Sequence, residues 1–406
     1  MLAFLLACAD APAADRPADD TVFPWVYTAE ADLEPYEEVR WETEDWDPLV
    51  DMDKSALYLQ KSYNYRPGAP IETLDHFEAM REAIPPLAGG KTMSFVGDIM
   101  WVGRNWASFA TPAASLLDGD IRVGNLETPV DPSQPTTPNE LGLYRFNAPP
   151  EILDGLPIDV IQLNNNHTED VGDSGVAATM AEVDARGYAR TGVDGFAMLG
   201  DIAILSYTWG INRRDVTPTH ELFIIPFGHP DVSIDRSSVT SDVQSARSDG
   251  ARSVVALVHW GYEYEFYPDP HFLILGRELI AAGVDLVVGQ GPHVVQPAEI
   301  CTVNDETVEP GVGTCSIHTP DGNRRTAAIL YSLGDFGTTL NGAPLSVGLV
   351  ATASLDPDVT GLGWAAVATI DGPDGPEVRP LDDLDDPELI VEGERLAAHV
   401  GASWKR

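Results

Sequence analysis

The sequence predicts an α/β protein in which helices cover a buried sheet with parallel or mixed strands. From residue 91 onward, short apolar runs typical of strands alternate with amphipathic stretches typical of helices. The runs are mostly apolar and lack a strict alternation of polar and apolar residues, as expected for strands buried on both faces. With 406 residues and 44% hydrophobic residues, the chain can bury a large core. In folds of this class, ligands bind at the carboxyl ends of the strands.

The expected elements follow one another along the main domain. Strands are predicted at 92–97, 159–164, 201–208, 253–260, 284–289 and 327–333. Helices are predicted at 174–187 and 270–283, and each ends at a glycine, which suits the left-handed residue at a helix C-terminus. A further helix is predicted at 72–83, before the first strand.

Composition divides the chain into four regions. We expect a signal- or lipoprotein-like segment with a tether at 1–20 and an acidic, aromatic extension at 21–90. The main domain is expected at 91–370, followed by an acidic C-terminal extension with a short helix at 371–406. The aromatic residues of 21–90 either pack onto the main domain or form a module that binds a sugar or a peptide.

The net charge limits the partners of this chain. Sixty-four acidic residues against 24 basic residues give −40 at neutral pH. Such a surface repels nucleic acid and anionic lipid, so we expect neither as a partner, whereas it attracts divalent cations. The same charge also arises when selection acts on solubility or on tolerance of salt.

The N-terminal residues resemble an export signal. Leu5, Leu6, Ala7 and Cys8 follow an apolar start, as in a lipobox, where the cysteine is lipidated. The alternative is an unprocessed terminus, because the apolar stretch is short and no basic residue precedes it. No run of about 20 apolar residues exists, so we expect membrane contact only through such a lipid anchor.

Two further cysteines remain once Cys8 is set aside. Cys301 and Cys315 flank a segment that we expect to be a hairpin with a Pro-Gly turn. In an exported protein the two cysteines would form a disulfide, and the alternative is two unrelated thiols.

Most of the apolar runs end at residues that bind metal or transfer protons. These residues are Asp98, Glu127, Asn165, Asn166, His167, His259, Gln290, His293 and Asp335. Carboxylates, amide oxygens and imidazoles together suit one or two Mn, Zn or Fe ions. Two ions about 3.5–4 Å apart can bind an anionic ester and activate water. A single His or Asn at a sheet edge is more often a hydrogen-bonding group, so the prediction depends on the whole cluster.

These residues lie in motifs that resemble the CapA family, which is associated with bacterial poly-γ-glutamate capsule synthesis. The motifs are SFVGDIM (94–100), VGNLETPV (123–130), QLNNNHTEDVG (162–172), VALVHWGYEYE (255–265), DLVVGQGPHVVQP (285–297) and ILYSLGDFG (329–337). The resemblance implies the fold of calcineurin-like metallophosphatases, a multi-layer α/β/β/α sandwich with mixed central sheets.

The resemblance also implies roles for individual residues. It implies metal ligation by Asp98, Glu127, Asn166, His259 and His293. His167 looks like the acid that protonates a leaving group, and the alternative is a histidine that fixes its loop by a hydrogen bond to the backbone. Arg104 looks like a residue that binds an anionic group, and the alternative is a surface salt bridge.

The chain departs from the family pattern at three positions. Gly291 stands where the family has a histidine, and Met100 stands where a metallophosphatase has another. Asp335 stands where the family has asparagine, which makes Asp335 a candidate substitute ligand. The expected metal site therefore has fewer imidazoles than that of an established phosphatase.

Two functions follow as expectations. The first is an exported, metal-dependent hydrolase of the cell envelope that acts on an anionic polymer or a small anionic ester and is linked to capsule biosynthesis. The second is a non-catalytic envelope component that binds the capsule polymer or helps to export it. The missing imidazole favours the second function.

Overall fold

A computed structural model describes most of the main domain and most of the C-terminal residues after it. The described residues are 69, 71–136, 145–212, 216, 219–223, 237–305, 311–319, 324–340 and 342–401. The predictions for the signal-like segment, Cys8 and the aromatic residues before position 69 concern residues outside these ranges. Within the described ranges, no helix is both long enough and apolar enough to cross a bilayer.

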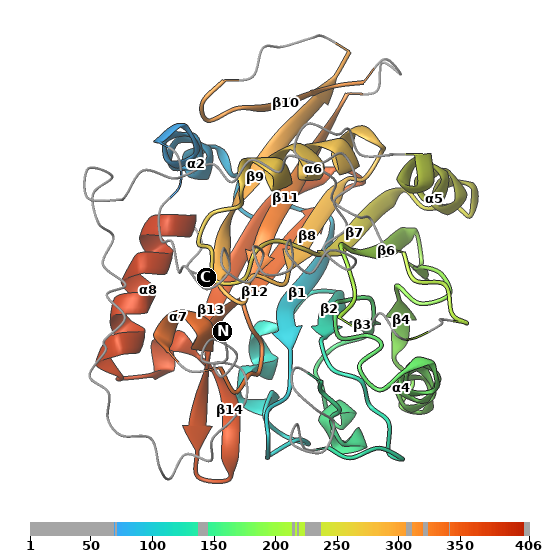
Figure 1. The fold of residues 1–406 in the computed structure, drawn as a ribbon. Helices are drawn as coiled ribbons and strands as arrows, with labels where there is room; N and C mark the ends of the chain where they lie inside the picture. The colour runs from blue at the N-terminus through green and yellow to red at the C-terminus, as the bar shows by residue number, and fades with distance from the viewer. Residues whose placement is uncertain are drawn as a thin grey trace, which may run out of the picture.

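Two seven-stranded sheets form the centre of the molecule (Figure 1). The first sheet has the order β14-β13-β12-β1-β2-β3-β4, and the second has the order β10-β9-β11-β8-β7-β6-β5. The first contains β1 (Lys91–Ile99), β2 (Ile121–Leu126), β3 (Val160–Gln162), β4 (Ala189–Thr191), β12 (Val347–Leu355), β13 (Val359–Gly372) and β14 (Gly375–Pro380). The second contains β5 (Ala197–Leu199), β6 (Ile202–Thr208), β7 (Ser253–His259), β8 (Leu286–Gln290), β9 (Val295–Asn304), β10 (Cys315–His318) and β11 (Arg325–Leu333).

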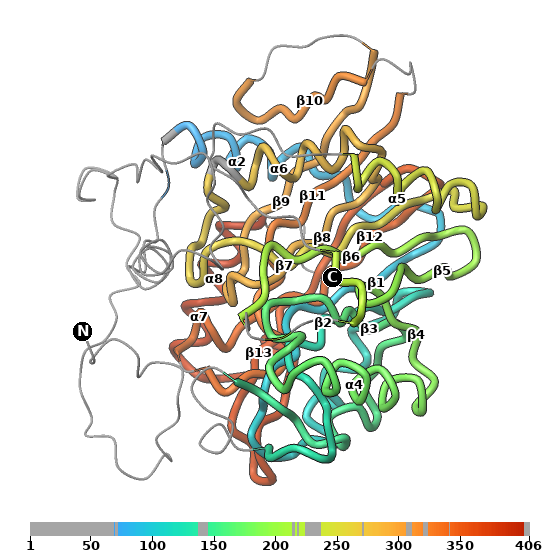
Figure 2. The backbone as a smooth tube through the Cα atoms, turned by 45° about the vertical axis from the view of Figure 1, so that its right-hand side comes forward, coloured from blue at the N-terminus to red at the C-terminus, as the bar shows by residue number. Residues whose placement is uncertain are grey.

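Helices cover the outer faces of both sheets (Figure 2). The α-helices are α2 (Ile71–Ala83), α4 (Asp173–Ala185), α5 (Ser237–Ser248), α6 (Pro270–Ala281), α7 (Ala343–Ser346) and α8 (Pro387–Val400). The 3₁₀ helices are η2 (Thr111–Leu116), η3 (Pro150–Leu153) and η4 (Leu381–Asp383). Residues of α4, η2 and η3 share a core cluster with the first sheet, and residues of α5 and α6 share one with the second. The expected α/β/β/α sandwich is therefore confirmed.

The apolar runs fill the sandwich because each strand buries both of its faces. In β7, Val255 and Leu257 belong to the core between the two sheets. Their neighbours Val254, Ala256 and Val258 belong to the core under α5 and α6. Alternate residues of a strand point to opposite faces, so a strand between two apolar layers has no polar alternation.

The parallel strands bring their carboxyl ends to one edge of the sandwich. Strands β1 to β4 pair in parallel in the first sheet, and β6, β7, β8 and β11 do so in the second. The two sheets meet at this edge, where Asp98 forms a parallel bridge with Asp335. A Cβ atom on Gly97 would lie 1.7 Å from the carbonyl oxygen of Gly334, so this approach requires a glycine.

The described residues after 370 continue the fold of the main domain. The boundary expected at 370 lies inside β13, and β14 extends the first sheet beyond it. The short helix expected in this region is α8, and its residues Leu389, Leu396 and Val400 join the core between the sheets. Asp386 caps the N-terminus of this helix, and its side chain accepts hydrogen bonds from the backbone N–H groups of Glu388 and Leu389.

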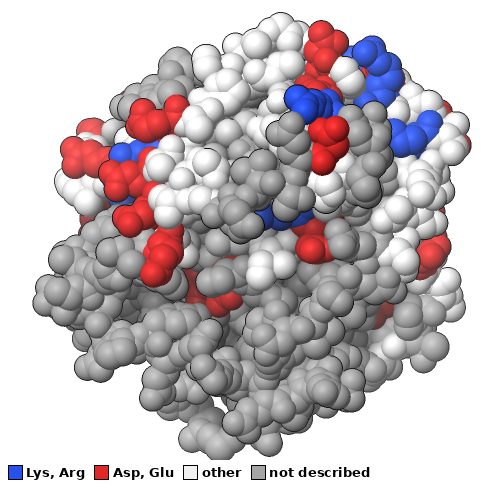
Figure 3. All heavy atoms as spheres, turned by 90° about the horizontal axis from the view of Figure 1, so that it is seen from above, with Lys and Arg blue, Asp and Glu red and all other residues white. Residues whose placement is uncertain are grey.

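Ion pairs neutralise many of the described arginines. Arg186 pairs with Asp154 and Glu182, and Arg247 pairs with Asp285. Figure 3 shows one face of the molecule, on which basic and acidic side chains of the described residues lie near one another at several places. An exposed pair such as that of Arg186 with Asp154 stabilises a protein by about 0–1 kcal/mol, whereas Asp285 is buried.

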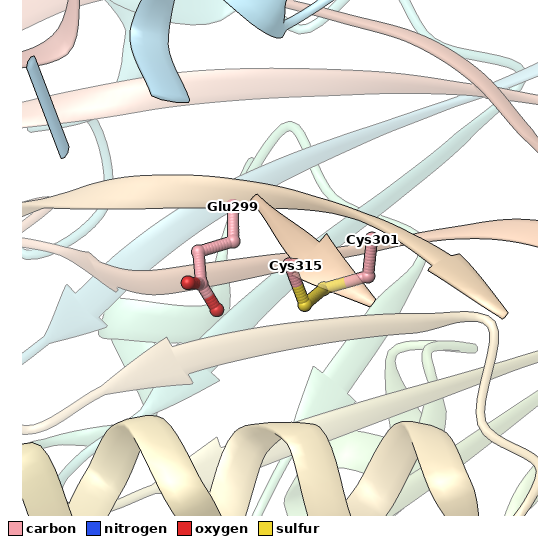
Figure 4. Close-up of side chains that lie close together, drawn as sticks. All are labelled: Glu299, Cys301 and Cys315. Atoms are coloured by element: carbon pink, nitrogen blue, oxygen red, sulfur yellow. A yellow bond between two sulfur atoms is a disulfide. The ribbon is translucent and has the colours of Figure 1, made fainter. Parts of the chain in front are cut away.

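A disulfide joins Cys301 of β9 to Cys315 of β10, with 4.5 Å between their Cα atoms (Figure 4). The two cysteines are direct partners of a parallel pair, so the hairpin expected between them is wrong. Strands joined by a hairpin run antiparallel, whereas β9 and β10 run in the same direction. Just before β10, the Thr314 amide donates to the Gly311 carbonyl in a turn.

Removal of this disulfide should destabilise the protein. In the double variant Cys301→Ala and Cys315→Ala, we expect the free energy of unfolding to fall by about 3 kcal/mol, the chain-entropy value for a loop of about 15 residues. Urea unfolding of variant and wild type, each with and without reductant, measures the effect. Reduced wild type should match the variant, and a reductant-insensitive wild type of equal stability would contradict the expectation.

Candidate metal centre

Six acidic and imidazole side chains meet at the edge where the two sheets join. The first sheet supplies Asp98 from β1, Glu127 after β2 and His167 after β3. The second supplies His259 at the end of β7, His293 between β8 and β9, and Asp335 after β11. All six side chains are buried. Because such charged and imidazole groups are rarely buried without a partner, the cluster points to a binding site.

The cluster contains two overlapping groups of ligand atoms that share Asp98. One consists of Asp98, Glu127 and His259, and the other of Asp98, His293 and Asp335, with the ligand atoms of each group within 4.8 Å of one another. In the first group, His259 Nε2 lies 3.4 Å from Glu127 Oε1. In the second, His293 Nδ1 lies 3.0 Å from Asp335 Oδ1 and 3.6 Å from Asp98 Oδ2. A shared carboxylate can hold one cation or bridge two.

Asp98 is held in place by two hydrogen-bond donors, one of which, Asn125, was not among the predicted site residues. The Asn125 amide donates to Asp98 Oδ1 over 2.6 Å, and the Gly291 backbone N–H donates to Asp98 Oδ2 over 2.9 Å. The Asn165 amide in turn donates to Asn125 Oδ1 over 3.0 Å. Asn125 lies two residues before Glu127, in the motif that identified the glutamate. Its place in that motif is the sequence signal that could have identified Asn125 as a site residue.

Glu127 has no hydrogen-bond donor on either carboxylate oxygen among the described residues, although its side chain is fully buried. Burial raises the pKa of Glu127 well above its ordinary value, and the charge of Asp98 raises it further. Oδ2 of Asp335 also has no partner in the described part of the chain. A buried carboxylate without a donor needs either a proton or a cation. These oxygens, together with nearby imidazoles, fit a divalent metal ion.

Burial and nearby charges also shift the pKa values of the neighbouring titratable groups. Burial raises the pKa of Asp98 to about 6, although His293 opposes the shift. Burial lowers the pKa of His259 well below its ordinary value, and the neutral imidazole is the form that binds metal. Burial also tends to lower the pKa of His293, but Asp335, Glu127 and Asp98 together raise it well above its ordinary value. A cation would therefore replace protons that these groups share.

His167 lies beside the two groups and points one ring nitrogen toward them. Its Nε2 is 4.0 Å from Glu127 Oε1, and its Nδ1 is 2.6 Å from Asp170 Oδ2. The ring of Phe146 packs against the imidazole with centroids 4.5 Å apart. The imidazole of His167 therefore pairs with a side-chain carboxylate. The alternative prediction, a histidine that fixes its loop, expected a hydrogen bond to the backbone instead. Nε2 of His167 faces Glu127, on the side of the two ligand groups.

The other two predicted site residues, Asn166 and Arg104, lie in different surroundings. Asn166 Oδ1 is buried without a hydrogen-bond partner among the described residues, while its backbone carbonyl accepts from the Asn212 N–H over 2.7 Å. Arg104 lies on the surface with a 58% exposed side chain, where it donates to Asp371. This contact is the surface salt bridge that was the alternative interpretation of Arg104.

The backbone conformation at Gly291 accounts for the absence of a histidine at this position. Gly291 has φ of 109°, and a Cβ atom there would lie 2.8 Å from the Trp260 carbonyl oxygen and 3.2 Å from His259 Nε2. A histidine at this position would therefore require the backbone to shift. His293 itself has φ of 58°, a conformation that L-residues adopt at a cost and that concentrates at functional sites.

The main domain is similar to known proteins of bacterial capsule synthesis. The family described as "Bacterial capsule synthesis protein PGA_cap" matches residues 92–339, a range that contains all six side chains of the cluster. "Capsule biosynthesis protein CapA" of Bacillus anthracis is 25% identical over 234 residues, which cover 52% of this chain and 56% of that protein. "PGA biosynthesis protein CapA" of Bacillus subtilis (strain 168) is 27% identical over 239 residues, which cover 51% and 58%. The chain thus spans a little over half the length of these curated relatives.

Proposed function

Because this chain belongs to the family of bacterial capsule synthesis proteins, we propose that it is an exported envelope protein that uses a divalent cation to hydrolyse an anionic polymer or ester of capsule synthesis. Export through the N-terminal segment and a lipid anchor at Cys8 are part of this proposal. The observation that carries it is the buried carboxylate of Glu127, which has no donor among the described residues and lies within ligand distance of Asp98 and His259. This arrangement favours a cation-binding site over a structural ion pair.

The residues that would hold the cation are those of the two overlapping groups. Asp98, Glu127 and His259 would hold one ion, and Asp98, His293 and Asp335 would hold a second if two bind. Asn166 would add a neutral oxygen. Mixed oxygen and nitrogen donors suit Mn, Zn or Fe. When bound, such an ion polarises an anionic ester and provides hydroxide near neutral pH.

The protein's own residues would carry out the remaining chemistry. Asp170 orients the His167 ring through Nδ1, which leaves Nε2 to give a proton to the departing oxygen. The amides of Asn125 and Asn165 hold Asp98 in one rotamer, so the ligand groups are fixed before the substrate arrives.

The substrate class is inferred from the relatives and from the charge. One relative is named for capsule biosynthesis and the other for PGA biosynthesis, and we propose a substrate of the same pathway, either poly-γ-glutamate or a smaller anionic ester. The net charge of −40 repels a polyanion. A long anionic polymer would therefore need cations between itself and this surface, whereas a small ester would not.

A second function is favoured by one specific observation. Gly291 leaves the cluster one imidazole short, and its backbone conformation hinders restoration of a histidine. A protein with this site could bind the capsule polymer through the cation, or help to export it, without cleaving it.

Metal analysis followed by an activity screen separates these functions. We expect purified protein, reconstituted with Mn or Zn, to retain at least about half an equivalent of metal, a threshold set low because the ligand set is incomplete. Turnover of phosphodiesters or γ-glutamyl peptides would support the hydrolase. Bound metal with polymer binding and no turnover would support the second function, and a chain that stays metal-free would contradict both.

A further inference from the structure

Strand β1 contains one extra residue just before Asp98. Val96 pairs with Gly124 of β2, and Asp98 pairs with Asn125, the next residue of β2. Gly97 therefore has no partner of its own on β2 and forms a β-bulge. A bulge changes the direction of the side chains that follow it, and bulges are frequent next to active sites. The direction of the Asp98 side chain thus depends on this bulge.

The bulge turns Asp98 toward the second sheet. Phe95 belongs to the core between the two sheets, whereas Val96 and Ile99 belong to the core on the outer face of the first sheet. In a regular strand, residues 96 and 98 would share a face, because side chains alternate. The extra residue shifts this alternation by one position, so Asp98 lies on the inner face, where the ligands from the second sheet are.

Two consecutive residues at the end of β8 bond to β1 on both sides of the bulge. Gln290 donates from its side-chain Nε2 to the Val96 carbonyl over 3.3 Å. The next residue, Gly291, donates its backbone N–H to Asp98 Oδ2 over 2.9 Å. The second sheet therefore holds the residues before and after Gly97 at the same time.

Backbone groups of the second sheet complete the contact with Asp98. The Asp98 N–H donates to the Gly334 carbonyl over 3.1 Å, and the Phe336 N–H donates to the Asp98 carbonyl over 2.7 Å. These bonds do not depend on the identity of a side chain. Gln290 contributes a side chain to the same arrangement, so its contribution can be removed by substitution.

The amide of Gln290 is buried and makes a bond at its nitrogen end. A backbone carbonyl only accepts hydrogen bonds, so the side-chain nitrogen must face Val96. Oε1 of Gln290 then has no hydrogen-bond partner among the described residues. Burial of an unpaired amide oxygen is unfavourable, and a methionine would fill a similar volume without it. Packing alone therefore does not require glutamine here, whereas the bond to β1 does.

We propose that Gln290 is a positioning residue of the metal centre. Its amide fixes the bulge of β1, and the bulge keeps Asp98, which both groups of ligand atoms share, directed at the second sheet. This inference rests on the proposed cation site for its consequence but not for its geometry. At the position where the family has a histidine, this chain acts on Asp98 through hydrogen bonds from residues 290 and 291.

Substitutions of Gln290 in the full chain test the proposal. Gln290→Met keeps the length of the side chain and removes the donor. Gln290→Asn keeps the amide but is one methylene shorter, so it separates the bond to Val96 from the polarity of the amide. The matched control is Thr191→Val, because Thr191 Oγ1 donates to the Ile204 carbonyl over 2.6 Å, which is also a buried side-chain bond between the two sheets. The readouts are Mn²⁺ affinity by titration calorimetry and hydrogen exchange of residues 94–99 in the metal-free protein, both below the melting temperatures of all variants.

We expect Gln290→Met and Gln290→Asn each to weaken Mn²⁺ binding about 10-fold or more, as for other groups that orient metal ligands, with faster exchange of 94–99. Thr191→Val should lower the melting temperature and leave the affinity and this exchange unchanged. If wild type binds no Mn²⁺, the proposed function fails, but the exchange of 94–99 still decides the positioning role. Wild-type affinity and exchange in Gln290→Met, wild-type affinity in Gln290→Asn, or an affinity loss equal to that of Thr191→Val would overturn the inference.

Discussion

Replacement of Glu127 by glutamine should abolish cation binding and at the same time stabilise the metal-free protein. Glutamine has nearly the same shape, and neither carboxylate oxygen of Glu127 loses a hydrogen bond, because neither has a donor among the described residues. Removal of the charge ends the repulsion with Asp98. We expect Mn²⁺ affinity to fall at least about 100-fold, the upper end of losses for groups around a metal ligand.

Thermal unfolding with and without metal measures both parts of this effect. At a metal concentration about 100 times the dissociation constant, wild type should gain about 2.7 kcal/mol, whereas Glu127→Gln should gain almost nothing. Without metal, Glu127→Gln should be more stable than wild type. Glu182→Gln, which removes a surface carboxylate paired with Arg186, is the control and should leave metal binding unchanged. A variant that is less stable without metal and still binds Mn²⁺ would show that Glu127 has a structural role only.

The raised pKa of Glu127 also makes the stability of the metal-free protein depend on pH. The pKa of Glu127 is raised in the folded state, so the folded chain binds this proton more tightly than the unfolded chain. The stability from this group is therefore present at acid pH and is lost as the pH rises above the ordinary range of a glutamate. In Glu127→Gln this part of the pH dependence should disappear, which unfolding curves across the acid range will show.

His167→Ala should reduce turnover by about 10²–10⁴-fold, the usual contribution of a general acid. His167 belongs to neither group of ligand atoms, so metal content should stay at the wild-type level. The free energy of unfolding should fall by about 1–3 kcal/mol, because the buried Asp170 carboxylate loses one of its hydrogen-bond partners. Steady-state kinetics on a substrate from the activity screen, with metal analysis of the same sample, separates the effects.

A histidine outside the site provides the control for this variant. His220 also pairs with an aspartate, since its Nδ1 lies 2.8 Å from Asp194 Oδ2. His220→Ala therefore removes a similar ion pair and should keep full activity. If His167→Ala retained wild-type turnover, His167 would have no part in the chemistry, and its pairing with Asp170 would serve only to order the loop.

The sequence was most informative where a buried strand ends at a polar residue. The runs before Asp98, His259 and Asp335 are apolar on both faces, so their identity as strands and their common direction could be predicted. Parallel strands share an edge, and this placed Asp98 and Asp335 in one cluster, although they lie near opposite ends of the main domain.

Other features depend on contacts that no local pattern reveals. Asn125 is a buried residue inside a strand, and although it lies in the motif of Glu127, its hydrogen bond to Asp98 is seen only in the structure. The residues between Cys301 and Cys315 have the composition of a hairpin, yet the strands pair in parallel. Strands β12 to β14 and helix α8 were missed or treated as an extension, because their role depends on a sheet formed by residues far earlier in the chain.

The division of the cluster between two sheets affects the order of events during folding. Asp98, Glu127 and His167 come from one sheet, and His259, His293 and Asp335 come from the other. Neither half alone offers the complete ligand set, so a cation can be captured with full affinity only after both sheets have docked. Metal loading would then be a late event that reports complete assembly of residues 91–335, and chains that stall before docking would leave the ion in solution.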